Sequence, residues 1–443
     1  MKYSVITFGC RVNQADSLGF EEDFLARGDT PASPEESDVV VVNTCSVTSS
    51  ADQAARQTIR RVARVNPGAK IIVTGCYATR RPDEVASLPN VLRVFSNTDK
   101  DNLVPDLTTA ERFGDGQGSC GATIEPGVAG RTAFTLRVQT GCSEPCSYCI
   151  IPTTRGVPIS MPVEKLLKQV DRVVAAGFKE IALTGVHLGS YGRDLNPQSS
   201  LIELLYAIAG LGRPEARPLR FEIGKGRHLE FGRGRLSGRP DKHVLFRISS
   251  LEPMDCTPEI VDLVAACDSF APHFHLPLQH ASNRLLAAMR RPYTIEYYST
   301  LVDRIRTEIP QASIGSDVIV GFPGETDQDF EYLADYLDGS PLTHLHVFPY
   351  SDRPGTSAAA LPDKVHGSIV RERANHLRAI SQRLSSRFRL AQIGTVHRAL
   401  TLDDGTLAVT GNYLKVKIPV GHTRNEWIAV RVVSEQHGEL LGG

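Results

Sequence analysis

The order of apolar and polar positions divides the chain into three stretches. In the first, continuous apolar runs alternate with segments of helical spacing, and these runs cover residues 3–8, 38–43 and 70–74. Unbroken apolar runs are typical of parallel strands that are buried on both faces. The first stretch is therefore predicted to be a doubly wound parallel α/β sheet, which binds ligands at the edge where its strands end.

Strands and helices alternate again after Thr132, on a larger scale. Apolar runs predict strands at residues 135–138, 180–184, 245–249, 273–278, 312–320 and 343–348. Between them, Pro162 opens a helix, and Thr257 is predicted to cap another that has Pro258 at its first position. Further helices are expected over residues 201–211 and from residues 294 and 326. Such repeats predict a partial βα barrel, with its functional residues at the carboxyl ends of the strands.

The third stretch has the pattern of short strands. A helix with an apolar stripe is predicted over residues 371–390. After it, short alternating strands are predicted at residues 395–402, 407–410, 415–419 and 427–433. Turn dipeptides separate several of these strands, which indicates a small antiparallel barrel.

Two polar, Gly-rich segments interrupt these patterns. Residues 111–131 are predicted to be an interdomain linker. Residues 213–247 are Gly-rich and basic, and they are predicted to be an insertion that is either a solvated loop or an arm that contacts phosphates. The predicted domains are therefore an N-terminal α/β domain (1–110), a barrel (132–389) and a small C-terminal barrel (390–443).

Composition constrains the compartment and the partners. The 443 residues carry a net charge of −1, which argues against a protein that binds nucleic acid with its whole surface. The N-terminus becomes polar too soon for a signal peptide and no apolar run could span a bilayer, so we expect a cytoplasmic protein without membrane attachment. The nine cysteines suit metal ligands better than disulfides. Cys120, Cys256 and Cys267 fit no ligand pattern and are expected to be ordinary thiols.

Cys142, Cys146 and Cys149, named here the motif thiols, have the spacing C-x3-C-x2-C directly after the first barrel strand. Three closely spaced thiolates suit an iron–sulfur cluster and leave one metal position without a protein ligand. That open position can bind a reactant. A structural metal site or buried thiols are the alternative.

Cys10, Cys45 and Cys76, named here the strand-end thiols, each follow one of the predicted N-terminal strands. Because parallel strands end at the same edge of a sheet, these distant cysteines are expected to converge into a second site of three thiolates. The alternative is that they only pack beneath loops.

The motif thiols, with Tyr148 just before the last of them, resemble the motif of the radical S-adenosylmethionine superfamily. Residues 9–14, 43–48 and 73–76 add three cysteine boxes upstream, and a small barrel follows downstream. With these features, nearly the whole chain resembles the methylthiotransferase family.

The resemblance implies a 4Fe-4S cluster on the motif thiols that binds S-adenosylmethionine and, once reduced, cleaves it to a 5′-deoxyadenosyl radical. It also implies a second 4Fe-4S cluster on the strand-end thiols, which carries sulfur that a second S-adenosylmethionine methylates. Asp317 and Glu325 flank a further strand end, where they bind the cofactor or only cap the turn. The residues expected to line the cofactor, each of which could instead be an ordinary rim residue, are Tyr148, Thr184, Gly185, Ser250, Glu252, Val320 and Gly321.

Residues 9–13, 183–189 and 345–351 resemble the family branch that adds a methylthio group to carbon 2 of threonylcarbamoyl-adenosine beside the tRNA anticodon. Residues 277–282, with residues 289–291, resemble as closely the branch that modifies an aspartate of a ribosomal protein. A non-catalytic iron–sulfur sensor that binds RNA is a third interpretation.

The partners that the resemblance implies are tRNA and a small electron-donor protein such as a flavodoxin or ferredoxin; no oligomeric state is predicted. In the C-terminal barrel, which resembles an RNA-binding module, Tyr413 and Trp427 either stack on bases or fill the core.

Overall fold

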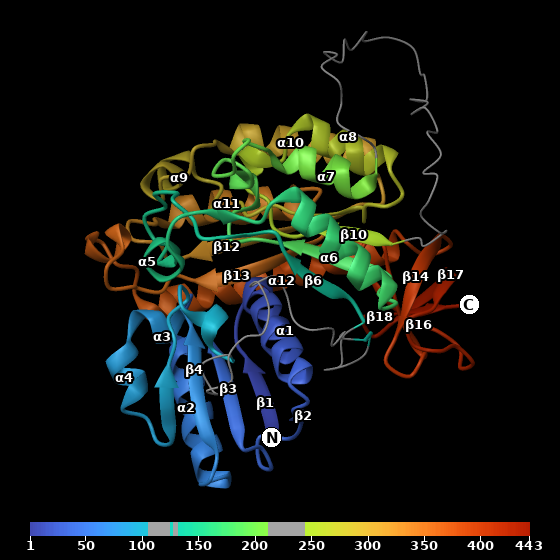
Figure 1. Ribbon diagram of the computed structural model, residues 1–443. Helices are drawn as coiled ribbons and strands as arrows, with labels where there is room; N and C mark the ends of the chain where they lie inside the picture. The colour runs from blue at the N-terminus through green and yellow to red at the C-terminus, as the bar shows by residue number, and fades with distance from the viewer. Residues whose placement is uncertain (105–124, 127–131, 211–243) are drawn as a thin grey trace.

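A computed structural model describes residues 1–104, 125–126, 132–210 and 244–443 (Figure 1). Nearly all of the predicted linker, and the predicted insertion up to residue 243, lie outside the described residues. In sequence order, the described part forms a parallel sheet covered by helices, a curved array of parallel strands, and a small closed barrel. This is the α/β architecture that the apolar pattern predicts.

The N-terminal unit is a parallel sheet with the strand order β2-β1-β3-β4-β5. Its strands are β1 (Lys2–Thr7), β2 (Thr30–Pro31), β3 (Val39–Thr44), β4 (Lys70–Gly75) and β5 (Val91–Val94). The helices between them are α1 (Arg11–Ala26), α2 (Ser49–Val65), α3 (Cys76–Arg80) and α4 (Pro82–Ala86). Val41 of β3 shares a core with Phe24 of α1, whereas its neighbour Val42 shares one with Ile59 of α2. The sheet is thus covered on both faces, which explains its unbroken apolar runs.

The central unit consists of parallel strands in two sheets, with the orders β10-β9-β6 and β11-β12-β13. Its strands are β6 (Phe134–Arg137), β9 (Glu180–Thr184), β10 (Leu245–Ile248), β11 (His273–His275), β12 (Ser313–Val320) and β13 (His344–Pro349). Backbone pairing of Phe246 with Phe270 joins the two sheets between β10 and β11. The result is an open, curved array, as expected for a partial barrel.

Helices cover the outer face of this array, and the N-terminal unit lies on its other side (Figure 1). The covering helices are α6 (Val163–Ala175), α7 (Leu201–Ala209), α8 (Pro258–Ala266), α9 (Asn283–Ala288), α10 (Ile295–Glu308) and α11 (Asp327–Gly339). Leu18 of α1 belongs to the same buried cluster as Leu136 of β6 and Leu183 of β9. The N-terminal and central units therefore share a continuous core.

Some predicted details of the central unit are wrong. Thr257 precedes α8, but its side chain makes no capping hydrogen bond. Helix α7 ends at Ala209 because Gly210 adopts the left-handed conformation at its C-cap. The predicted strand over residues 273–278 ends at His275, since Pro277 has no N–H to donate to a neighbouring strand.

The C-terminal unit is a closed barrel with the strand order β14-β15-β16-β18-β17. Its strands are β14 (Val396–Leu402), β15 (Leu407–Thr410), β16 (Lys415–Lys417), β17 (Trp427–Gln436) and β18 (Glu439–Gly442), the last of which was not predicted. Helix α12 (Gly367–Leu390) connects it to β13. The side chain of Asn412 donates to the Gln311 carbonyl at 2.9 Å, so the barrel sits where the central strands begin. No helix of the described residues is long and apolar enough to cross a membrane.

Candidate active site

The motif thiols lie in the loop that precedes α5 (Ile151–Arg155). Gly141 opens this loop with φ +75°, and a Cβ atom there would lie 1.9 Å from the carbonyl oxygen of Val157, so only glycine fits. The backbone N–H of Ser147 donates to the Met289 carbonyl at 3.1 Å. Backbone contacts thus fix the loop, and its three thiols form no disulfide and are partly exposed.

Burial sets the protonation of these thiols. It raises the pKa of Cys142, and it raises the pKa of Cys149 to about 12, with further increases from the neighbouring motif thiols. Thiolates, not thiols, bind metals, so loading a metal centre here is expected to displace protons.

Arg291 links the motif to one of the residues predicted to line the cofactor. Its Nη1 atom lies 3.3 Å from Cys146 Sγ and 3.3 Å from Glu252 Oε1, and its guanidinium lies 5.1 Å from the centre of the Tyr293 ring. Arg291 therefore bridges Cys146 and Glu252, and it positions this carboxylate beside the motif.

Gln139 joins the motif to the end of β9. Its side-chain amide donates to the Gly141 carbonyl at 2.7 Å, and its Oε1 accepts from the backbone N–H of His187 at 3.0 Å. A Cβ atom at Gly185 would lie 3.0 Å from this same Oε1. Thr184 and Gly185 accordingly lie beside the motif loop, as the strand-end argument predicts.

Tyr148 packs against the end of β12, in one cluster with Ile319 and Phe322. The side chain of Val320 instead lies in the helix-covered core with Val318, on the opposite face of the strand, so the prediction that it lines the cofactor is wrong. The backbone N–H of Gly321 donates to Glu325 Oε2 at 2.8 Å. Glu325 is buried and pairs with Arg373 at 2.5 Å, so it holds the turn after β12. Of the two roles considered for Glu325, the structure favours the structural one.

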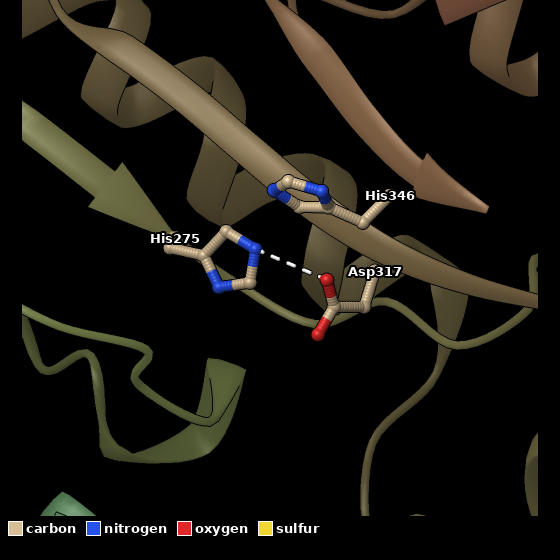
Figure 2. A group of neighbouring side chains, drawn as sticks. All are labelled: His275, Asp317 and His346. Atoms are coloured by element: carbon tan, nitrogen blue, oxygen red, sulfur yellow. Dashed lines mark ion pairs between the residues drawn. The ribbon is translucent and has the colours of Figure 1, made fainter. Parts of the chain in front are cut away.

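Ser250 contacts a polar group on the inner face of the central strands. Its Oγ lies 2.8 Å from His275 Nδ1, and His275 Nε2 lies 3.1 Å from Asp317 Oδ1 (Figure 2). The prediction that Asp317 flanks the end of β12 is wrong, because it lies within the strand. Its neighbour Val318 faces the helix-covered core, so Asp317 faces the opposite side, together with His346 of β13.

The strand-end thiols converge at the edge of the N-terminal sheet. Cys10 precedes α1, Cys45 follows β3, and Cys76 is the first residue of α3. Gly9 has φ +90°, and a Cβ atom there would lie 2.7 Å from Cys45 Sγ. Burial, together with the neighbouring Cys76 and Cys10, raises the pKa of Cys45 to about 11, and the two cysteines contribute only because they are close to it.

The spacing within each set of thiols fits a cluster better than a single ion. Among the described residues, the group His275, Asp317 and His346 is the only one with three potential ligand atoms all within 4.8 Å of one another. A tetrahedral ion with metal–sulfur bonds of about 2.3 Å would need its thiolates closer than this limit. Neither set of described thiols meets this limit, so neither is arranged as closely as a single tetrahedral ion would hold it.

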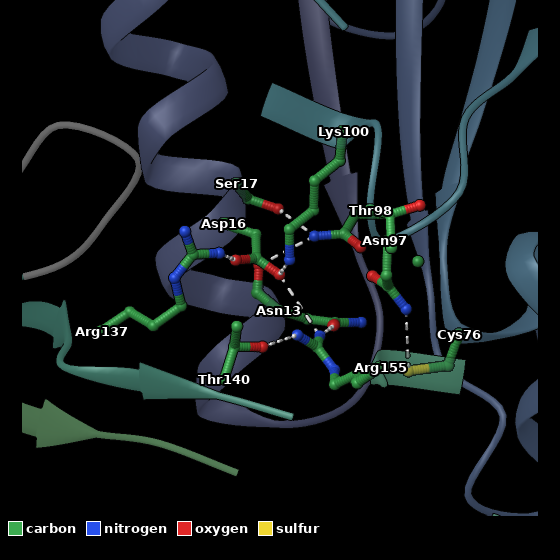
Figure 3. A network of polar contacts seen from close by, with 12 residues as sticks. Asn13, Asp16, Ser17, Cys76, Asn97, Thr98, Lys100, Arg137, Thr140 and Arg155 are labelled. Carbon is green, nitrogen blue, oxygen red and sulfur yellow. Dashed lines mark hydrogen bonds and ion pairs between the residues drawn. The ribbon is translucent and has the colours of Figure 1, made fainter. Parts of the chain in front are cut away.

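A buried charge network connects the two sets of thiols (Figure 3). Arg155, at the end of α5, lies 3.3 Å from Asp16 of α1 and beside Cys76, which raises the arginine's pKa. Lys100 Nζ lies 2.6 Å from the same carboxylate, which Arg137 also contacts. The loop of the motif thiols and the sheet of the strand-end thiols are thus held together by one charge network.

Family models match both of these units. The model of the uncharacterized protein family UPF0004 matches residues 2–96, and that of the Radical SAM superfamily matches residues 136–337. The chain is 35% identical to threonylcarbamoyladenosine tRNA methylthiotransferase MtaB of Aquifex aeolicus, over 94% of this chain and 96% of the relative. It is 32% identical to MtaB of Bacillus subtilis, over 98% of each chain. The chain belongs to the radical S-adenosylmethionine tRNA methylthiotransferases.

Other similarities agree with this family. The chain is 31% identical to tRNA-2-methylthio-N(6)-dimethylallyladenosine synthase of Paenarthrobacter aurescens, over 88% of this chain and 73% of the relative. The radical S-adenosylmethionine methyltransferase TsrM of Kitasatospora setae, solved with cobalamin and a [4Fe-4S] cluster, has a TM-score of 0.54, 14% identity and coverage of 81% and 76%, which shows a shared fold. The methylthiotransferase is thus an enzyme that acts on tRNA and uses S-adenosylmethionine and an iron–sulfur cofactor.

The sequence argument missed the residues that connect the motif thiols to the strand-end thiols and to the ends of the other strands. Arg155, Arg291 and Gln139 contact groups that are close in space but mostly distant in sequence. The signal available for Arg155 was its place soon after the motif, and for Arg291 it was the resemblance of residues 289–291 to a family motif. Tyr413 and Trp427 lie outside the buried cluster of the C-terminal barrel, so the core alternative for these aromatics is wrong.

We expect Asp16→Asn to destabilise the methylthiotransferase by about 3 kcal/mol, because it leaves buried cations without their counter-charge. Burial alone would raise the pKa of Asp16, but Arg137, Lys100 and Arg155 outweigh it and lower that pKa to about 2. The corresponding stabilisation, about 2 kcal/mol, is complete above the ordinary pKa near 3.9 and lost as the pH falls toward 2.

Urea unfolding at pH 7 and pH 3 tests this expectation. Glu22→Gln is the matched control on the same helix, because its ion pair with Arg172 is partly exposed and is expected to contribute under about 1 kcal/mol. Equal unfolding midpoints for the two variants would contradict the assigned role of Asp16.

Proposed function

We propose that this enzyme transfers a methylthio group to carbon 2 of threonylcarbamoyl-adenosine beside the tRNA anticodon, with two 4Fe-4S clusters and two molecules of S-adenosylmethionine. The observation that carries the proposal is the pair of three-thiol sites, one on each side of the contact between the N-terminal and central units. A generator of radicals and a carrier of sulfur must both reach one substrate atom, and holding them in place supplies much of the rate. The relatives named for threonylcarbamoyl-adenosine support the choice of substrate.

In this proposal the motif thiols hold the first cluster, and the remaining strand ends position S-adenosylmethionine against it. When bound, the first cluster supplies the electron that cleaves the sulfonium of S-adenosylmethionine; a small protein such as a flavodoxin or ferredoxin would deliver that electron. Tyr148 covers one side of the site, while Glu252, fixed by Arg291, offers a carboxylate. Thr184, Gly185, Ser250 and Gly321 complete the lining.

The strand-end thiols would hold the second cluster, which supplies the sulfur atom. Asn97 Nδ2 lies 3.7 Å from Cys76 Sγ, and Arg155 lies beside the same sulfur, so polar donors surround this ligand. Donors of this kind stabilise negative charge on a bound cluster and tune its potential.

Mass spectrometry of tRNA nucleosides tests the substrate. A strain that lacks the gene is expected to lose the methylthio form of threonylcarbamoyl-adenosine, and plasmid-borne enzyme is expected to restore it. Retention of that nucleoside in the deletion strain would overturn the proposal. A methylthiolated aspartate in a ribosomal protein, lost in the same strain, would replace it.

The C-terminal barrel offers a site for an unstacked base of the tRNA. A cavity of about 540 Å³ between this barrel and the central unit is lined by Trp427, Arg398 and Asn412, among others. The Arg398 guanidinium lies 3.8 Å from the centre of the Trp427 ring. Aromatic rings and arginine planes are the surfaces on which proteins stack single-stranded bases.

We expect Trp427→Ala to weaken tRNA binding about tenfold, the scale of one base-stacking contact. Trp427→Phe is the control that keeps an aromatic face and is expected to bind nearly as the wild type. Fluorescence anisotropy with labelled tRNA at one salt concentration measures both. An unchanged dissociation constant for the alanine variant would exclude this barrel face from RNA binding.

A further inference from the structure

Arg11 brings a positive charge to the meeting point of all three units. It directly follows Cys10, one of the strand-end thiols, and is the first residue of α1. Its Nη1 lies 3.3 Å from Ser249 Oγ, just after β10, and its Nη2 lies 3.3 Å from the hydroxyl of Tyr413 in the C-terminal barrel.

The Arg11 guanidinium has no anionic partner among the residues that the structure describes. Its two hydrogen bonds there go to neutral hydroxyls, and no described carboxylate lies within 4.0 Å of it. A guanidinium has five N–H donors in a planar fork that matches a carboxylate. The Arg247 guanidinium, which also faces Tyr413, is by contrast already paired with Glu180 at 2.9 Å.

A cavity of about 320 Å³ lies beside Arg11, between α1, the starts of β6 and β9, and the C-terminal barrel. Thr132, Thr135 and Gln14 line it with hydroxyl and amide groups. Its other charged lining residues are Glu180, Asp403 and Lys415. The lining is mixed, with more apolar than polar surface, and Arg11 is the cation in it that adjoins the strand-end thiols in sequence.

The histidines on the inner face of the central strands do not supply this charge. Burial lowers the pKa of His344 to about 4, and it also lowers the pKa of His273 and of His346. These three imidazoles are therefore neutral at pH 7. Arg11 and Lys415 are the cations at this cavity without a described ion pair, and of the two only Arg11 adjoins a strand-end thiol in sequence.

The substituent on the substrate is what distinguishes the two tRNA branches among the relatives. Threonylcarbamoyl-adenosine carries a carboxylate on the substituent of its amino group, whereas dimethylallyl-adenosine carries an apolar chain. An enzyme that acts on threonylcarbamoyl-adenosine needs a cation to bind this carboxylate, at a distance from the reacting carbon. An enzyme that acts on dimethylallyl-adenosine needs no such cation.

We infer that Arg11 binds the carboxylate of the threonylcarbamoyl group, and that the cavity beside it holds the rest of this substituent. The inference rests on the proposed function and names the residue that selects its substrate. Arg11 directly follows Cys10, a ligand of the proposed second cluster. When Arg11 binds the substituent, it therefore also places carbon 2 of the adenine near the sulfur that is to be transferred.

The test compares one tRNA in two forms, with threonylcarbamoyl-adenosine or with plain adenosine beside the anticodon. For Arg11→Gln we expect the KM and the dissociation constant of the modified tRNA to rise about 10- to 100-fold, the scale of a lost charge-assisted hydrogen bond. The dissociation constant of the plain tRNA should not change. Arg11→Lys should recover part of the loss, and Arg64→Gln, an exposed arginine in the last turn of α2, should match the wild type.

The other outcomes overturn the inference in distinguishable ways. Equal weakening for both tRNAs would mean that Arg11 contacts a phosphate. Loss of iron or of the cluster absorption in Arg11→Gln would mean that it supports the neighbouring ligand Cys10. Unchanged preference in a variant with full iron content would leave Arg11 without a role in selection. If the wild type forms no methylthio product from the modified tRNA, the proposed function itself fails.

Discussion

Cys146→Ala is expected to abolish both 5′-deoxyadenosine formation and methylthio transfer, each by about a thousandfold or more, the scale of losing an essential group. In the proposed function Cys146 is one of three cluster ligands in a loop that backbone contacts hold, and Arg291 lies 3.3 Å from its sulfur. Its neighbours Cys142 and Cys149 are ligands themselves in this proposal, so neither can replace it. Reconstituted enzyme with dithionite as reductant, assayed by liquid chromatography, measures both products.

The matched control for this variant is Cys267→Ala. Cys267 is partly buried at the end of α8, outside both sets of thiols. It is expected to keep wild-type iron content and both activities. If Cys146→Ala still formed deoxyadenosine, the motif thiols would not be the site at which S-adenosylmethionine is cleaved.

Cys45→Ala is expected to have a selective effect. Methylthio transfer should fall below detection, while deoxyadenosine formation stays within about twofold of the wild type, because the described interactions of Cys45 involve neither the motif thiols nor Arg155. Iron content should fall by about half in this proposal, since four of eight iron atoms belong to the second site. Iron analysis and the two product assays on the same sample check these three expectations.

Two other results for Cys45→Ala would each favour a different interpretation of the strand-end thiols. If Cys45→Ala kept full iron content and full methylthio transfer, these cysteines would only pack beneath their loops. If it lost deoxyadenosine formation as well, the two sites would act as one unit, and the charge network through Arg155 and Asp16 would be the connection to examine by variants.

Much of the fold follows from the sequence because apolar runs and glycines act locally. The valines of β3 predicted a strand buried on both faces, and Pro162 stands directly before α6, the helix that it was predicted to open. The misses have local causes too. Helix α7 stops at Gly210, inside the predicted range, and the missed strands β2, β5 and β18 have only two to four residues each.

For the candidate site, the sequence determined which groups are present and at which strand ends they stand. The spacing of the motif thiols is local, and the positions of Cys10, Cys45 and Cys76 follow from the rule that parallel strands end at one edge. Both are properties that a linear pattern carries.

Only the tertiary structure decided which of these groups meet. It paired Arg155 with Asp16, set Arg291 between Cys146 and Glu252, and left Arg11 facing Ser249 and Tyr413 without a described anionic partner. Such contacts join residues up to 402 positions apart in the chain. Long side chains reach partners that no local periodicity encodes, so their pairing is settled by how the three units pack and bury charge.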